Sequence, residues 1–186
     1  MSSALLVMDV QQAIVDAVDD GSGYLPRLRG AIDGARAAGL PVIYVTIAFR
    51  PGFPEIGTRN KPLAAIAAAG LYVEGAPGTE IHPEVAPLPG DVVVTKKRAS
   101  AFSGSDLDVV LRARGIDSLV LTGIATSAVV LSTVCQANDL DYGLTILPDA
   151  CLDTDPEVHR VLVERLFPQW AEVVEVDEWV RSLATG

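Results

Sequence analysis

The amino-acid sequence predicts a three-layer α/β/α fold, in which helices cover both faces of a six-stranded parallel β-sheet. Short apolar runs lack polar alternation, so both faces of these strands must be buried, as in a parallel sheet. Segments with helix-like spacing separate the runs, which gives the βαβ rhythm of a doubly wound, Rossmann-like sheet with right-handed crossovers.

The elements follow one another along the chain in this alternating order. Apolar runs predict strands at residues 4–10, 41–47, 91–95, 118–122, 143–147 and 171–176. Helical patterns occupy residues 24–38, 106–114 and 156–167, another helix follows the fourth strand to about residue 140, and a terminal helix comes after residue 176. Residues 51–89 are rich in Gly, Pro and Ala and predict an excursion with a short helix at 63–69. No linker interrupts the pattern, so residues 1–186 are expected to form a single domain.

Composition restricts the class of partner. The formal net charge of −10 argues against nucleic acid and against anionic membranes. The first apolar run is too short to span a membrane and lacks a basic flank, so it predicts a strand rather than a signal peptide. The two cysteines, Cys135 and Cys151, have no metal-type spacing. We therefore expect a cytoplasmic protein that acts on a small molecule.

Three chemically active features follow strands of the predicted sheet. Asp9 ends the first strand, Lys96 follows the third, and a tight turn at Gly123 follows the fourth. Ligands of open α/β sheets bind beyond the carboxyl ends of the strands, so we expect these features to converge. Asp9 is either a helix N-cap or a functional carboxylate. Lys96 either belongs to a solvated basic cluster, or pairs with Asp9 and depresses the pKa of that carboxyl.

Four ordered stretches make the chain resemble a known family. They are LLVMDVQ, VVTKKRASAFSGSDLD, LVLTGIATSAVVLST and LTILPDAC. Together they resemble the isochorismatase-like hydrolases, also called the cysteine hydrolase superfamily. The resemblance extends over nearly the whole chain and implies the six-stranded isochorismatase fold, usually as dimers or higher oligomers.

The resemblance also implies roles for particular residues. Most family members use Asp, Lys and Cys, and Asp9 and Lys96 match the first two. The position of the cysteine is occupied by Val129, which has no nucleophilic atom. The family turn often contains a non-proline cis peptide bond, which in this chain would join Ile124 to Ala125, the expected oxyanion turn.

Other residues are further candidates for the site or are excluded from it. Cys135 lies six residues beyond Val129 and is expected to be inert, buried packing. No zinc-ligand set can be assembled from His82 and His159, so neither a metal nor another cofactor is expected. Candidate substrate-binding residues are Gln11, Phe49, Arg50, Phe102 and Ser127.

Three hypotheses of function remain. The first is a hydrolase that uses Asp9 and Lys96 in acid–base catalysis without a cysteine, as in the vinyl-ether cleavage of isochorismatases. Isochorismatases typically have a His where this chain has Ser127, so isochorismate itself does not follow from the resemblance. The second is an idle family member that binds a small carboxylate or serves as an assembly subunit. The third is an amidase that uses Cys135.

Overall fold

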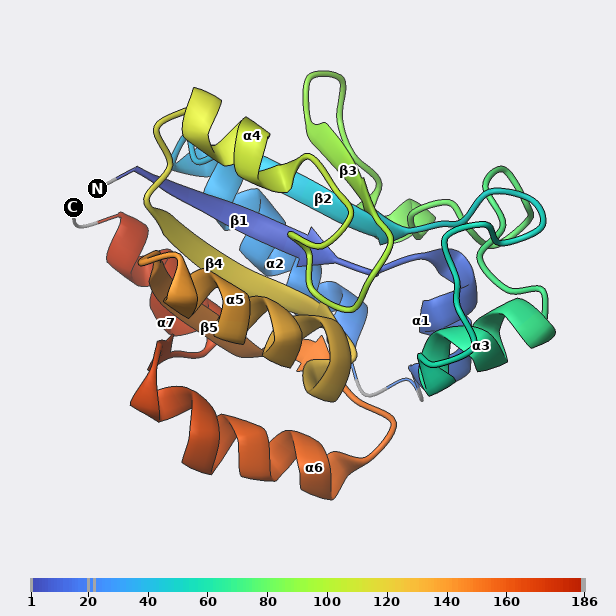
Figure 1. The fold of residues 1–186 in the computed structure, drawn as a ribbon. Helices are drawn as coiled ribbons and strands as arrows, with labels where there is room; N and C mark the ends of the chain where they lie inside the picture. Colours follow the sequence, from blue (N-terminus) through green and yellow to red (C-terminus); the bar gives the residue numbers. More distant parts are fainter. Residues whose placement is uncertain (1, 20, 22, 185–186) are drawn as a thin grey trace.

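The computed structural model describes residues 2–19, 21 and 23–184, and in this part of the chain six parallel strands form one sheet (Figure 1). The strands are β1 (Ser3–Met8), β2 (Val42–Ile47), β3 (Val92–Lys96), β4 (Ser118–Ile124), β5 (Gly143–Leu152) and β6 (Glu172–Val173). Their order is β3-β2-β1-β4-β5-β6. The direction of winding reverses between β1 and β4, which is where open α/β sheets bind ligands.

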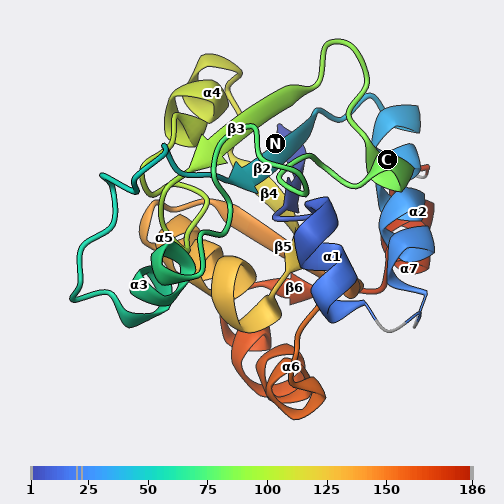
Figure 2. The same cartoon turned by 90° about the vertical axis from the view of Figure 1, so that its right-hand side faces the viewer.

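Helices cover both faces of the sheet, which confirms the predicted fold class. They are α1 (Gln12–Val18), α2 (Tyr24–Ala37), α3 (Lys61–Ala68), α4 (Leu107–Ala113), α5 (Leu131–Asp139), α6 (Pro156–Val161) and α7 (Val176–Leu183). Figure 2 shows α2 and α7 on one side of the strands and α4 and α5 on the other. None of the helices described is long and apolar enough to cross a bilayer.

The alternation of side chains along β1 explains the two layers of core. Leu5 and Val7 pack with residues of α2 and α7, whereas Leu6 and Met8 pack with residues of α4 and α5. All four side chains are almost completely buried. A strand that buries both faces cannot alternate with polar residues, which is why β1 reads as one apolar run.

Several boundaries differ from the sequence prediction. Helix α1 was not predicted, and β5 continues to Leu152 because the end of β4 pairs with it at Gly123–Cys151 and Ile124–Leu152. β6 contains only Glu172 and Val173. A π-helical turn at Thr126–Val130 precedes α5, and another at Leu162–Leu166 follows α6.

The predicted excursion between β2 and β3 carries α3, which begins two residues earlier than expected. Two isolated bridges hold the excursion to the sheet, one between Gln11 and Ile81 and one between Phe49 and Val73. In Figure 1, α3 lies beyond the end of the sheet, and Figure 2 shows α3 and α1 apart from each other. The excursion therefore places a helix over the carboxyl ends of the strands.

Candidate active site

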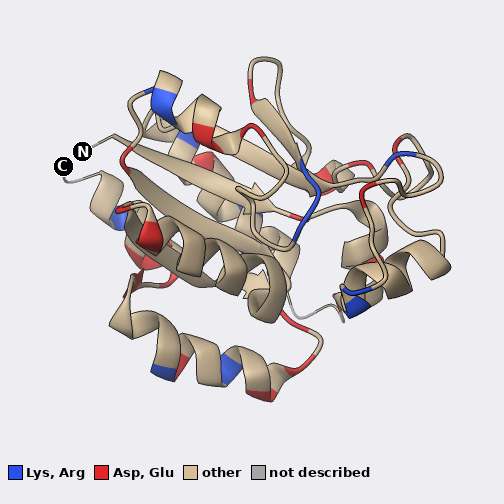
Figure 3. Ribbon diagram, in the orientation of Figure 1, with Lys and Arg blue, Asp and Glu red and all other residues tan. Residues whose placement is uncertain are grey.

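Asp9 and Lys96 form a buried ion pair at the carboxyl end of the sheet. Lys96 Nζ lies 2.8 Å from Asp9 Oδ2, and the two side chains are 1% and 9% exposed. Asp9 is the first residue after β1 and donates its backbone N–H to Val45 O of β2, while Lys96 ends β3. Figure 3 shows the basic run that follows β3, in blue, near the end of β1.

The two oxygens of the Asp9 carboxyl have different surroundings. Oδ2 pairs with Lys96, whereas Oδ1 is buried without a hydrogen-bond partner. Lys96 Nζ also donates to Arg98 O at 3.0 Å. Burial raises the pKa of Asp9 above its ordinary value of 3.8, and the charge and hydrogen bond of Lys96 oppose this without cancelling it. Lys96 therefore lowers the pKa of Asp9, as expected, but burial is the larger effect and the net direction is upward.

The turn after β4 reaches this ion pair because β1 and β4 are neighbours. Met8 pairs with Gly123, and a Cβ on Gly123 would collide with the Met8 carbonyl. Gly123 has a φ of 145°, a backbone conformation that residues with a side chain rarely adopt. The peptide bond between Ile124 and Ala125 is cis, at the position that the family resemblance implied.

Three backbone N–H groups after the cis peptide bond are engaged within the fold. Ser127 donates its backbone N–H to Asp153 Oδ2 at 2.6 Å. Ala128 and Val130 both donate to Ala125 O. These three groups are engaged within the fold, so they cannot all serve a substrate in this conformation.

The ion pair and the turn line one cavity of about 250 Å³. The remaining walls come from α1, from α3 and from the loops near β2 and β3. The lining residues are Asp9, Ile14, Val18, Ile47, Pro62, Leu63, Ile66, Tyr72, Lys96, Ala99, Ile124, Ala125, Ala128 and Val129. Val129, at the position that the resemblance assigns to the cysteine, is 1% exposed and presents only hydrocarbon.

A second, larger cavity of about 460 Å³ shares Val18 with the lining of the Asp9 cavity. Its lining includes Cys151, Asp153 and His159 but neither Asp9 nor Lys96. Burial raises the pKa of the Cys151 thiol to about 12, so this thiol is protonated at neutral pH. Size alone does not identify a site, and the smaller cavity is the one that contains the buried Asp9–Lys96 ion pair and the turn after β4.

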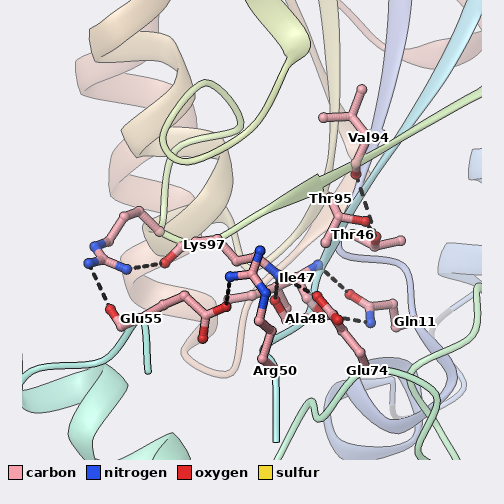
Figure 4. Close-up of polar contacts among 11 residues, drawn as sticks. Gln11, Thr46, Ile47, Ala48, Arg50, Glu55, Glu74, Val94, Thr95 and Lys97 are labelled. Carbon is pink, nitrogen blue, oxygen red and sulfur yellow. Dashed lines mark hydrogen bonds and ion pairs between the residues drawn. The ribbon is translucent and has the colours of Figure 1, made fainter. Parts of the chain in front are cut away.

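The five candidate substrate-binding residues lie outside the lining of the Asp9 cavity. The Gln11 amide accepts from Ile47 N and donates to Ile47 O and Thr79 O, as Figure 4 shows for Ile47. Phe49 is fully buried in a small apolar cluster, and Phe102 packs against Tyr142. The last two, Arg50 and Ser127, are exposed.

The wall that α3 and Tyr72 provide was not predicted from the sequence. Leu63 and Ile66 are three residues apart, so they face the same side of α3. This spacing was the available signal, but it does not show which part of the sheet the helix covers.

The remaining cysteine and histidines do not join the site. Cys135 is exposed on α5, so the expectation that it is buried is wrong, and it does not line the cavity. His82 Nδ1 accepts from Glu84 N, and His159 Nδ1 lies 2.8 Å from Thr126 Oγ1. Among the residues that the structure describes, no three His, Cys, Asp or Glu side chains are grouped so as to hold a metal ion.

Comparison with known proteins extends the resemblance found in the sequence. A family model described as the isochorismatase domain matches residues 3–178. The chain is 36% identical to the ureidoacrylate amidohydrolase RutB of Stutzerimonas stutzeri, over 99% of this chain and 84% of that protein.

Two solved structures show the same fold. A cysteine hydrolase from Pseudomonas syringae pv. phaseolicola has a TM-score of 0.90 and 25% identity, covering 98% of this chain and 92% of that one. The N-carbamoylsarcosine amidase from Thermoplasma acidophilum has a TM-score of 0.79 and 30% identity, covering 95% of this chain and 98% of that one.

Proposed function

Because the chain belongs to the isochorismatase family of hydrolases, we propose that it hydrolyses a small molecule by acid–base catalysis from Asp9 and Lys96, without a covalent nucleophile. The observation that carries this proposal is the buried ion pair, in which Asp9 Oδ1 has no partner while Oδ2 lies 2.8 Å from Lys96 Nζ. A carboxyl group with one oxygen held and the other free suits proton transfer at the free oxygen.

Asp9 serves as the proton donor in this mechanism. Burial raises its pKa, so a larger fraction of the carboxyl holds a proton than at an exposed aspartate. Oδ1 gives this proton to the substrate, and Lys96 stabilises the carboxylate that forms. Water then adds to the protonated substrate and loses a proton to Asp9, which restores the acid. The net reaction consumes one water and leaves the enzyme unchanged.

Acid-labile bonds suit this site better than amide bonds do. Val129 has no atom that can attack a carbonyl, and an amide carbon is a poor target for unactivated water. A vinyl ether needs only protonation before water adds to it. The amidohydrolase and amidase names of two similar proteins make amides and carbamates the necessary comparison.

A screen of hydrolysis tests this proposal directly. Vinyl ethers, amides and carbamates of similar size are incubated with the unmodified protein and with Asp9→Asn, and products are followed by NMR. We expect vinyl-ether cleavage that the substitution reduces by about a hundredfold or more, the scale of a general acid. Turnover that survives in Asp9→Asn contradicts the role of Asp9.

An idle member that binds a small molecule is the second candidate, and the hydrocarbon of Val129 favours it. The same screen separates the two, because an idle member binds ligands in the Asp9 cavity and turns over none of the three classes. The proposed assembly is a homo-oligomer, as the resemblance implies, and the proposed location is the cytoplasm.

A further inference from the structure

The walls of the Asp9 cavity carry almost no charge beyond the ion pair. Among the described lining residues, Asp9 and Lys96 are the charged ones, and their charges cancel while the Asp9 carboxyl is ionised. This is the state that a substrate meets before Asp9 takes up the proton that the proposed mechanism uses. Tyr72 adds a phenol whose pKa burial raises, so it stays neutral at physiological pH. The other lining side chains are hydrocarbon. A substrate in this cavity therefore meets polar groups at the ion pair and at Tyr72, and apolar walls elsewhere.

The basic residues next to the cavity already have partners. Lys97 Nζ donates to Ala48 O and to Glu74 Oε1, both at 2.6 Å, and Arg50 pairs with Glu55 at 2.7 Å (Figure 4). Arg98 donates to the backbone carbonyls of Lys97 and Glu55. None of these three cations lines the cavity.

Two further cations lie at the start of α3 but outside the cavity. Arg59 and Lys61 are exposed, whereas Pro62 and Leu63 are the first residues of this segment to line the cavity. A carboxylate on the body of a substrate would thus leave water without gaining a cation. Burying an unpaired carboxylate is strongly unfavourable.

We propose that the substrate of this site is a small, uncharged and largely apolar molecule with one polar reacting group. The reacting group lies at the ion pair, where the unpartnered Asp9 Oδ1 meets a donor or supplies a proton. The rest of the molecule contacts Leu63, Ile66 and the turn. The inference rests on the proposed function only in taking this cavity as the substrate site.

The volume of the cavity limits the size of this molecule. A cavity of about 250 Å³ lies just below the small end of the range for ligand pockets, which is roughly 300–1,000 Å³. This is the size of a short branched chain or a substituted small ring with one functional group.

Two amides of identical shape test the charge of the substrate without requiring turnover. In 4-methylpentanamide an isopropyl group stands where succinamate has a carboxylate, and the amide ends are the same. Binding of each to the unmodified protein is measured by calorimetry at neutral pH. We expect 4-methylpentanamide to bind at least about tenfold more tightly. Equal or tighter binding of succinamate overturns the inference, and so does a failure of 4-methylpentanamide to bind.

Substitutions on the cavity wall show where the amide binds and why it is preferred. Ala128→Phe adds a ring from an exposed position and should abolish binding of 4-methylpentanamide, whereas unchanged binding places the probe elsewhere and overturns the inference. Ile66→Lys supplies the missing cation and should reduce the preference by at least about tenfold. The neutral control Ile66→Met should keep the preference in the same direction. An unaltered preference in Ile66→Lys contradicts the charge argument.

These outcomes are independent of the hydrolysis screen. Binding of the apolar amide without any turnover by Asp9 defeats the proposed mechanism and leaves the inference standing. If turnover depends on Asp9 but succinamate binds more tightly than 4-methylpentanamide, the proposed mechanism stands and the inference about substrate charge fails.

Discussion

Lys96 Nζ lies 2.8 Å from Asp9 Oδ2 although β2 runs between the two strands that carry these residues. The pair is possible because both residues stand where their strands end, so their side chains meet beyond the end of β2. Neither charge has much access to water. Each charge is therefore stabilised mainly by the other. Removal of either residue should change both the free energy of unfolding and the rate of hydrolysis.

A double-mutant cycle should show that Asp9 and Lys96 are coupled in stability. Asparagine has nearly the same side-chain shape as aspartate and tolerates the backbone φ of 56° at this position. Asp9→Asn nevertheless leaves the buried Lys96 without a counter-charge, which should lower the free energy of unfolding by about 3–5 kcal/mol. Lys96→Met leaves the Asp9 carboxyl without its partner. The double variant should be more stable than the sum of the single effects by at least about 1 kcal/mol. Urea unfolding measures all four proteins, and simple additivity contradicts the coupling.

The pH dependence of hydrolysis should report the raised pKa of Asp9. The proposed mechanism needs the protonated carboxyl, so the rate falls as the pH rises through this pKa. Because burial raises the pKa, the fall should occur above the range of an ordinary aspartate. Lys96→Met removes the groups that lower the pKa, so the fall should move to still higher pH while the maximal rate decreases. A fall that moves to lower pH in Lys96→Met contradicts the assignment.

Hydrolysis should not depend on a thiol. Val129 occupies the position of the family cysteine, and Cys135 lies outside the cavity. Cys135→Ala should retain full turnover, and iodoacetamide should not abolish the activity of the unmodified protein. Val129→Cys provides the positive control, since a thiol at this wall should make the activity sensitive to the reagent. Loss of turnover in Cys135→Ala, together with inactivation of the unmodified protein, restores the displaced-cysteine hypothesis.

Turnover should also survive the removal of metal ions. The reason is the lack of a suitable group of ligands among the described residues, together with the engagement of both histidines elsewhere. Activity is measured after exhaustive dialysis against EDTA and again after addition of zinc. If chelation removes activity and zinc restores it, the metal-free mechanism is wrong.

The sequence was sufficient to predict the centre of the site but not its walls. Asp9, Lys96 and Gly123 stand at strand ends, and parallel topology alone brings strand ends together. Leu63 and Ile66 reach the cavity through an excursion whose path depends on two isolated bridges. Such non-local pairing has no periodic signal in the sequence.

Gln11 shows a second reason for failure. A glutamine near a candidate catalytic carboxylate suggests substrate binding, but the Gln11 amide satisfies the backbone N–H and carbonyl of Ile47 at the end of β2. Backbone groups at a buried strand end must be paired, and this demand cannot be read from residue types alone.

Gly123→Ala should damage both the fold and the site. The methyl group would meet the Met8 carbonyl, and the φ of 145° is unfavourable for alanine. Backbone strain and overpacking together should lower the free energy of unfolding by about 2 kcal/mol or more. Because Met8 precedes Asp9, a shift of the turn away from β1 should also reduce turnover.

Gly30→Ala is the matched control for this prediction. It adds the same methyl group inside α2, where the nearest atom is Val176 Cγ1 at an ordinary contact distance of 3.6 Å. Alanine favours a helix over glycine by up to about 1 kcal/mol, so Gly30→Ala should be neutral or stabilising and fully active. Urea unfolding and the hydrolysis assay are applied to both variants. If Gly123→Ala and Gly30→Ala are equally stable, β1 and β4 can separate at Gly123 without cost. The contact between Gly123 and Met8 would then not fix the position of the turn relative to Asp9.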